Sequence, residues 1–187
     1  MSRVHLTPPI GATLGDHRSA LGLRWLGLGV SIFAIQMALV QGLATVPAGV
    51  RWLPFLIPTA HLLLIPFLAR NLSFWGMRLV LAGLILNLAA MLANGGLMPV
   101  EPSVVRAVGS IELSELRPGD HVPGTKNSLL AASDSRVSFL SDRFVIPMPG
   151  PFRAAVSIGD FLVAGGVLVA YVEVVSRYSN RRGLPDG

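Results

Sequence analysis

The sequence lacks cysteine altogether and is poor in charged residues. Without cysteine, the protein cannot contain a disulfide framework, a thiol nucleophile or a thiolate-held zinc or iron–sulfur site. Charged residues make up 13% of the 187 positions, against about 25% in soluble domains, and hydrophobic residues make up 52%. So few charges cannot cover the surface of a water-soluble globule. The composition therefore indicates a membrane protein, of one or at most two domains.

Basic residues nevertheless outnumber acidic ones by 15 to 10, which gives a formal net charge of +5. They are scattered singly or in pairs between apolar segments, whereas a nucleic-acid-binding domain gathers its basic residues on one face. We therefore expect no nucleic-acid partner, and we expect these residues to flank membrane segments.

Four apolar segments predict an all-α membrane protein, a bundle of about four transmembrane helices. Each is close to the length of about 20 residues that crosses a hydrocarbon core of about 30 Å. Trp25, Trp52 and Trp75 stand beside segment ends, as aromatic anchors at a membrane interface do. The four segments are residues 25–44, 52–69, 77–93 and 157–175.

The distribution of arginine predicts the orientation of these segments. Arg70 directly follows the second segment, Arg78 lies at the start of the third and Arg177 follows the fourth, whereas the loop between the first two offers only Arg51. By the positive-inside rule both termini are cytoplasmic, in a multi-pass protein of the cell membrane. No cleavable signal is expected before the first segment. The predicted parts are a cytoplasmic segment (1–24), three spans (25–96), an extracytoplasmic loop (97–156), a fourth span (157–175) and a cytoplasmic tail (176–187).

The loop of residues 97–156 is long for a linker and is expected to carry the specificity of the protein. Apolar positions between residues 104 and 111 predict a short surface helix. Val137, Leu140 and Phe144 recur at helical spacing and predict an amphipathic helix within residues 133–146, capped by Ser133 or Asp134. The loop is therefore expected to be partly ordered.

Polar residues inside the predicted spans include Gln36, His61 and Asn87. No second histidine lies in a span, so a metal site is not expected, and His61 is best explained as hydrogen-bonded to Gln36, to Asn87 or to a carbonyl freed by proline. A pathway lined by these three residues in an oligomeric transporter is the alternative.

Small and polar residues form a stripe along the third span. Gly83, Asn87, Ala90 and Asn94 follow helical spacing and predict a packing face, with a ligand site as the less favoured alternative. Gly166 and Ala170 give the fourth span a second small-residue face. We expect the two faces to meet.

Asp160 lies close to the start of the fourth span, three residues after Ser157. This spacing is that of a capping box, in which the carboxylate lies near the free N–H groups of the first helical turn. The functional alternative is that Asp160 holds a loop cation, either Lys126 or Arg136.

The loop and the adjoining span ends contain no recognisable catalytic motif, whether a GxSxG nucleophile elbow, HExxH, Walker A or GxGxxG. Mixed charges on an exposed loop usually pair with one another, and an active site is the less favoured interpretation. No cofactor and no metal are expected. The candidate polar cluster, functional or structural, consists of Asn94, Lys126, Asp134, Arg136, Asp142, Ser157 and Asp160.

The order of several short motifs resembles a family of small bacterial multi-span proteins, domain of unknown function 5317 (DUF5317). They are NGGLMPV (94–100), GTKNSLL (124–130), DSR (134–136), FLSD (139–142), IP (146–147) and VSIGD (156–160). The resemblance covers about residues 20 to 171 and implies an integral membrane protein of bacteria with no assigned activity. Two features depart from it: the residues before Leu23 are polar where the family has a further apolar span, and Asn127 stands where a histidine is expected.

Three functions remain open at this stage. A non-enzymatic scaffold or accessory subunit, presenting an ordered outer loop to a membrane protein or a second copy of the chain, fits the packing faces and the missing catalytic motifs. A membrane-embedded enzyme acting on lipid or cell-envelope material at the outer surface would use the candidate cluster. An oligomeric transporter would use Gln36, His61 and Asn87. All three share the lipid bilayer as a partner.

Overall fold

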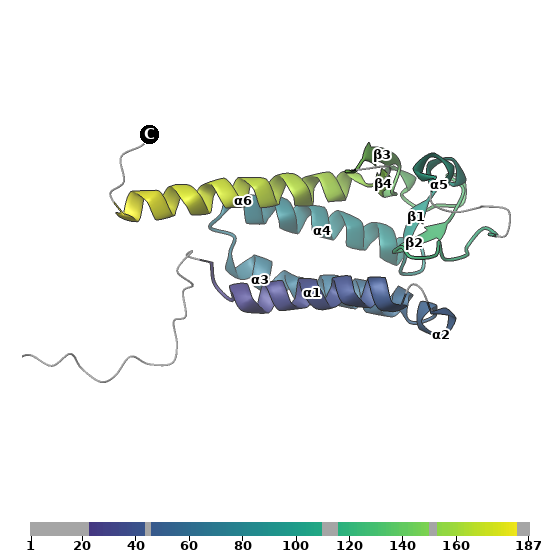
Figure 1. Ribbon diagram of the computed structural model, residues 1–187, viewed down its shortest axis with the longest axis horizontal. Helices are drawn as coiled ribbons and strands as arrows, with labels where there is room; N and C mark the ends of the chain where they lie inside the picture. The colour runs from purple at the N-terminus through teal and green to yellow at the C-terminus, as the bar shows by residue number, and fades with distance from the viewer. Residues whose placement is uncertain (1–22, 44–45, 110–115, 150–152, 183–187) are drawn as a thin grey trace, which may run out of the picture.

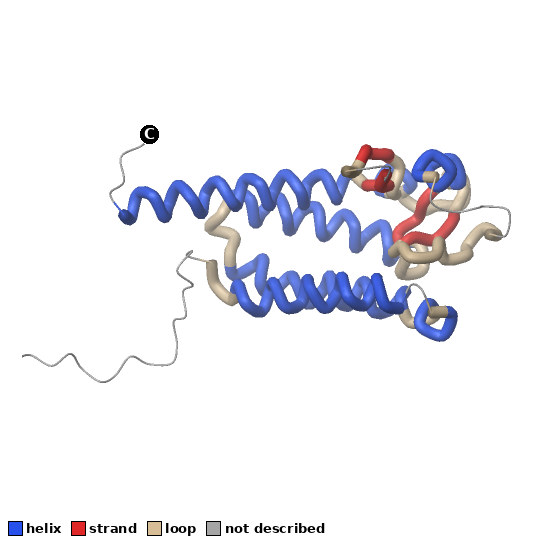
Figure 2. The backbone as a smooth tube through the Cα atoms, in the orientation of Figure 1, coloured by secondary structure: helices blue, strands red, loops and turns tan. Residues whose placement is uncertain are grey.

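The computed structural model describes residues 23–43, 46–109, 116–149 and 153–182. Long helices run side by side, and a small mixed structure, which we call the cap, lies at one end of them (Figures 1 and 2). The cap comprises residues 97–109, 116–149 and 153–156. Most of the predicted segment 1–24 lies outside the described residues.

Four long helices form two packed pairs: α1 (Leu26–Leu43) with α3 (Leu53–Arg70), and α4 (Trp75–Ala93) with α6 (Ile158–Arg182). A single turn, α2 (Pro47–Val50), precedes α3. Among the described residues three helices are long and apolar enough to cross a membrane, namely Leu53–Arg70, Trp75–Ala93 and Ile158–Asn180. The apolar helical stretch of α1, Gly27–Leu39, is shorter. The span predicted at residues 25–44 therefore stays a prediction.

Small residues bring α4 and α6 into backbone contact. A Cβ atom added to Gly83 would lie 2.5 Å from the carbonyl oxygen of Gly159, and one added to Gly166 would lie 2.7 Å from that of Gly76. Small residues of the two helices do meet, but not in the expected combination. Gly166 and Ala170 pack against Gly76, which precedes the predicted stripe, and Gly83 of the stripe packs against Gly159. Side chains this small let two helix backbones approach closely without a hydrophobic driving force between them.

The turn after α4 depends on glycine. Gly95 and Gly96 have φ angles of +84° and +97°, which side chains disfavour, and a Cβ atom on Gly96 would collide with the carbonyl oxygen of Pro54. Pro58 has no N–H, so this carbonyl lacks its usual helical donor. The turn thus brings the start of the cap directly against the first turn of α3.

The cap contains two small sheets and two short helices. Strands β1 (Met98–Val100) and β2 (Asn127–Leu129) are parallel, and β3 (Phe144–Pro147) and β4 (Arg153–Val156) are antiparallel. An isolated bridge joins Val100 to Asp142. The short helices are α5 (Pro102–Val108) and the 3-10 helix η2 (Ser138–Leu140). Valines of β1 and α5 pack with Val122 and Leu129 into a core of their own.

Two expectations about this region are corrected. The amphipathic helix within residues 133–146 is wrong, because turns and η2 lead into β3 there, and Val137 has a left-handed φ of 53° that ends helical geometry. Val145 and Ile146 favour a strand once β4 supplies hydrogen-bonding partners. The all-α expectation is therefore wrong for the cap. The helix expected near residue 104 is α5; Ile111, at the end of that pattern, lies outside the described residues.

Exposed tryptophans paired with arginine stand at both ends of the helices. Arg70 lies over the ring of Trp25 at 4.5 Å and Arg78 over that of Trp75 at 4.2 Å, both at the end opposite the cap. Arg51 lies over Trp52 at 5.2 Å, before α3 at the cap end. Amphipathic rings beside cations are typical of the two interfaces of a membrane.

Candidate functional site

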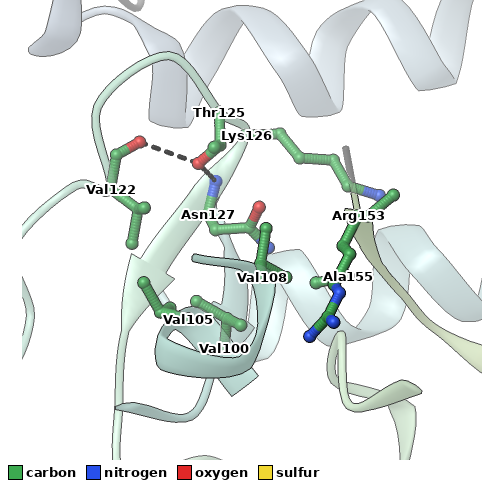
Figure 3. A pocket seen from close by; sticks show the side chains of 10 residues that line it. Val100, Val105, Val108, Val122, Thr125, Lys126, Asn127, Arg153 and Ala155 are labelled. Atoms are coloured by element: carbon green, nitrogen blue, oxygen red, sulfur yellow. Dashed lines mark hydrogen bonds between the residues drawn. The ribbon is translucent and has the colours of Figure 1, made fainter. Parts of the chain in front are cut away.

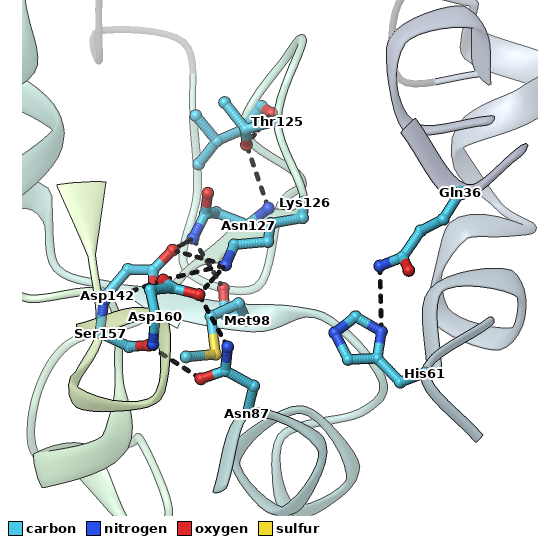
Figure 4. Close-up of polar contacts among 11 residues, drawn as sticks. Gln36, His61, Asn87, Met98, Thr125, Lys126, Asn127, Asp142, Ser157 and Asp160 are labelled. Atoms are coloured by element: carbon cyan, nitrogen blue, oxygen red, sulfur yellow. Dashed lines mark hydrogen bonds and ion pairs between the residues drawn. The ribbon is translucent and has the colours of Figure 1, made fainter. Parts of the chain in front are cut away.

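The charged cluster, which we define as Lys126, Asp142 and Asp160, joins the cap to the helices (Figure 4). The Lys126 Nζ atom lies 3.6 Å from Asp142 Oδ2 and 3.3 Å from Asp160 Oδ2. Lys126 directly precedes β2, Asp142 follows η2, and Asp160 lies in the first turn of α6. The Lys126 side chain is 30% exposed, whereas that of Asp142 is 0% exposed. Three chain segments thus meet at one ammonium group.

Asp160 is both a cap of its helix and an ion-pair partner. Its backbone N–H donates to Ser157 Oγ, and the Ser157 N–H donates to Asp160 Oδ2, both at 3.0 Å, which completes the capping box. The two sequence interpretations are therefore compatible, with Lys126 as the cation.

Asn87 connects this arrangement to α4. Its Nδ2 atom donates to Asp160 Oδ1 at 2.7 Å, and its Oδ1 atom accepts from the Ser157 hydroxyl at 2.8 Å. A polar side chain of the small-residue stripe thus holds the start of α6.

Only one of the two carboxylate oxygens of Asp142 has a hydrogen-bond partner among the described residues. Asn127 Nδ2 donates to its Oδ2 atom at 2.8 Å, and its backbone N–H donates to the Pro99 carbonyl at 3.0 Å. Its Oδ1 atom has no hydrogen-bond partner among the described residues. Burial raises the pKa of Asp142 to about 6, although the nearby Lys126 charge opposes this.

The ammonium of Lys126 is stabilised by its two carboxylates. Burial alone lowers the pKa of Lys126, but Asp142 and Asp160 together outweigh this effect, so that the pKa lies above its usual range. At neutral pH Lys126 therefore remains a cation and is not a free base.

Three other predicted site residues lie outside the charged cluster. Asn94 exchanges two hydrogen bonds of 2.8 Å with the backbone of Arg136, so it ties α4 to the cap through the main chain. Asp134 is exposed and accepts from the Ser133 hydroxyl at 3.2 Å. The structure therefore divides the predicted set into the charged cluster with Ser157, the contact between Asn94 and Arg136, and Asp134.

Gln36 and His61 form a separate buried contact between α1 and α3 (Figure 4). Gln36 Nε2 lies 3.1 Å from His61 Nδ1, which is also 2.8 Å from the Ile57 carbonyl oxygen. This carbonyl lies one turn before His61 and is not one freed by proline. If His61 Nδ1 donates its proton to the Ile57 carbonyl, it cannot also accept a hydrogen bond from the Gln36 amide nitrogen. The Gln36 amide must then turn its Oε1 atom toward the ring, and this atom has no other partner among the described residues.

Two polar residues that sequence reasoning missed secure the opposite end of the helices. Glu173 of α6 accepts the backbone N–H groups of Trp75 and Gly76 at 3.0 and 2.9 Å, so it caps the start of α4. Asn71 accepts from the Arg24 N–H at 2.8 Å and donates to its carbonyl at 2.9 Å. The signal for Glu173 was its place as an acid late in the last apolar segment, close to Arg177.

The chemistry of these groups is that of ion pairing and hydrogen bonding. In the part of the chain that the structure describes, no group of three or more histidine or acidic residues could hold a metal ion. The cluster supplies one fixed cation, one capping carboxylate and one buried carboxyl that titrates near pH 6.

A comparison with protein families gives one match. The model of the family of unknown function DUF5317 matches residues 20–172, which is most of the chain. Searches of the curated proteins and of the solved structures gave no match.

Proposed function

Since the chain belongs to the DUF5317 family, whose description assigns no activity, we propose its role from its geometry. We propose that it is a non-enzymatic scaffold or accessory subunit of the cell membrane. It holds the cap outside the membrane as a rigid surface for a membrane-protein partner.

The observation that carries this proposal is the use of the charged cluster. Lys126 binds Asp142 of the cap and Asp160 of α6, and Asp160 at the same time caps its helix. The contact between Asn94 and Arg136 fixes the cap to α4 a second time. Polar groups employed in this way keep the cap in one orientation, as a docking surface requires, and leave few groups for catalysis.

The proposed orientation has support from the arginines. Arg70, Arg78 and Arg177 gather around the loop between α3 and α4, where Arg78 and Arg177 donate to the carbonyls of Leu72 and Ser73. This loop lies at the end opposite the cap. By the positive-inside rule that end is cytoplasmic, together with both termini.

The absence of cysteine allows a direct test of this orientation. We would introduce single cysteines at two exposed serines, Ser103→Cys in α5 and Ser73→Cys between α3 and α4. A membrane-impermeant maleimide applied to intact cells should label the first variant, and should label the second only after permeabilisation. The reverse pattern would overturn the orientation.

The second candidate is a membrane-embedded enzyme acting on lipid or cell-envelope material at the outer surface. The observation that favours it is Asp142, whose pKa of about 6 suits proton transfer near neutral pH and whose Oδ1 atom has no partner among the described residues. The transporter has less support, because Gln36 and His61 bind each other and Asn87 binds Asp160 and Ser157.

The variant Asp142→Asn separates scaffold from enzyme. The amide keeps the shape of the side chain but cannot take up or release a proton near neutral pH. In a deletion strain the variant should restore the wild-type phenotype at matched abundance and melting temperature. A folded variant of normal abundance that fails to complement would contradict the scaffold and favour the enzyme.

A further inference from the structure

A cavity of about 320 Å³ lies in the cap between α5, the β1–β2 pair and β4 (Figure 3). Its apolar wall includes Val100 of β1 and Val105 and Val108 of α5. The volume is at the lower end of the range of about 300 to 1,000 Å³ that is typical of small-molecule sites. A cavity of this size and lining suits one short hydrocarbon chain.

The charged residues that line this cavity are both cations. Among the described residues these are Lys126, at the top in Figure 3, and Arg153 of β4; no described carboxylate belongs to the lining. Arg153 Nη1 donates to the Ala107 carbonyl at 3.0 Å, and a guanidinium has five N–H donors in all. Arg153 is exposed and lines the cavity, and no other hydrogen bond joins its guanidinium to a described residue.

Lys126 keeps capacity for a further acceptor. Its distances to the two carboxylates, 3.3 to 3.6 Å, are longer than those of a tight charged hydrogen bond, about 2.7 to 2.9 Å. Asp142 and Asp160 also take donors from Asn127 and Asn87. The ammonium is therefore shared loosely, and the Lys126 side chain, which lines the cavity, is 30% exposed.

We propose that this cavity binds a single-chain anionic amphiphile. A phosphate or carboxylate head lies between Lys126 and Arg153, and its hydrocarbon chain lies along the valines of β1 and α5. A neutral ligand would leave the Arg153 guanidinium without a counter-charge, because no described carboxylate pairs with it, whereas Lys126 already has two. A fully polar anion would leave the apolar wall unfilled. The proposal goes beyond the scaffold role and does not depend on it.

Photo-crosslinking tests this proposal on the full chain in nanodiscs of phosphatidylcholine. The probe is decyl phosphate with a diazirine at the end of its chain. It should label peptides that contain Val105 or Val108, and unlabelled decyl phosphate should compete whereas decanol should not. A second arm uses the single-chain lipid lysophosphatidylglycerol carrying the diazirine in its acyl chain. Labelling in this arm identifies a bilayer lipid as the source, and labelling by decyl phosphate alone identifies a free amphiphile.

A matched pair of arginine variants makes the test specific. Arg153→Gln should reduce labelling about tenfold, the loss expected for one charge-assisted contact, without lowering the melting temperature. Arg106→Gln removes an exposed cation of α5 that does not line the cavity, and it should label like the wild type. Equal losses in both variants, competition by decanol, or no labelling of the cavity in either arm would overturn the proposal.

Discussion

The two helix pairs are held together by different means. Between α4 and α6, glycines of each helix lie directly against the backbone of the other. Asn87 and Asp160 connect these two helices at the cap end, and Glu173 caps α4 at the other end. Between α1 and α3, Gly29 faces the ring of Phe67, Gln36 contacts His61, and Asn71 holds the Arg24 backbone at the end opposite the cap. Both pairs therefore have polar contacts, but only α4 and α6 pack backbone against backbone. That packing permits one arrangement, whereas the Phe67 ring can shift.

The two helix pairs also differ in their contact with the cap. The cap is attached to α4 through Asn94 and to α6 through Asp160, so the pair with the close interface is also the one that carries the cap. The scaffold role that we propose requires a rigid part of this kind beneath the docking surface. The following predictions test the contrast, from the largest expected effect to the smallest.

Gly166→Val should have the largest effect. The added Cβ would lie 2.7 Å from the backbone of Gly76 and of Val80, which cannot move aside, and overpacking of this kind costs about 3 kcal/mol or more. The melting temperature in detergent should fall sharply. Its neighbour Gly165 has nothing within 4 Å, so Gly165→Val is the matched control and should melt near the wild type. Equal losses would mean that helix propensity and not interface packing is the cause.

Gly29→Ala extends this test to the other pair. Its Cβ would lie 2.8 Å from the Phe67 ring, which can turn, so its melting temperature should fall less than that of Gly166→Ala. The opposite order would remove the contrast between the two helix pairs.

Asp160→Asn should come next. The amide keeps the shape of the side chain but removes one of the two charges that face Lys126. Breaking a partly buried ion pair in this way should lower the free energy of unfolding by about 3 kcal/mol. The control is Asp134→Asn, an exposed change that should stay within about 0.5 kcal/mol. A loss as small as that of the control would show that the charged cluster does not hold the cap.

Asp142 should make stability depend on pH. Its pKa is about 6 in the folded protein, against about 3.9 when unfolded, so the native state binds this proton more tightly. Protonation of Asp142 therefore contributes to the free energy of unfolding, by at most about 3 kcal/mol. This contribution is complete below about pH 4 and is lost as the pH rises to about 6. The melting temperature of the wild type should therefore fall between pH 4 and pH 6 when it is measured relative to that of Asp142→Asn. Parallel curves for the two proteins from pH 4 to 7 would contradict the assignment.

Gln36→Leu should have the smallest effect. Its Oε1 atom has no partner among the described residues, and a hydrogen bond between membrane helices averages about 0.6 kcal/mol. We expect less than about 1 kcal/mol in the free energy of unfolding. Asn87→Leu, which removes contacts to both Asp160 and Ser157, should cost clearly more. Similar values for the two variants would abolish the difference between the helix pairs.

Local patterns predicted the helical part of this structure well. Hydropathy located both ends of α3 and α4 and the start of α6 to within two residues, because each signal lies within one segment. The end of α6 lies at Arg182, beyond the predicted end at residue 175. The capping box of Ser157 and Asp160 was readable for the same reason, since its two members are three residues apart. The small-residue stripe predicted a packing face, and Gly83 and Asn87 do lie at the interface of α4 and α6.

The cap could not be read in the same way. Its strands have three or four residues each, and β1 pairs with β2 across 29 positions of sequence, so neither strand has a complete local signal. The spacing of Val137, Leu140 and Phe144 imitated a helix, whereas the pairing of β3 with β4 decided otherwise. Within the candidate set, nothing in the sequence separated Asp142, which reaches Lys126, from Asp134, which does not.

The sequence by itself determined that long apolar helices dominate this protein, that arginine and tryptophan mark their ends, and that Asp160 caps the last of them. These properties depend on composition and on neighbours within one helical turn. Only the tertiary structure decided that Lys126 lies between two carboxylates, that Glu173 caps a different helix, and that the cap encloses a cavity with two cations. The reason is that each of these contacts joins residues far apart along the chain, whose distance is set by how the helices and strands pack.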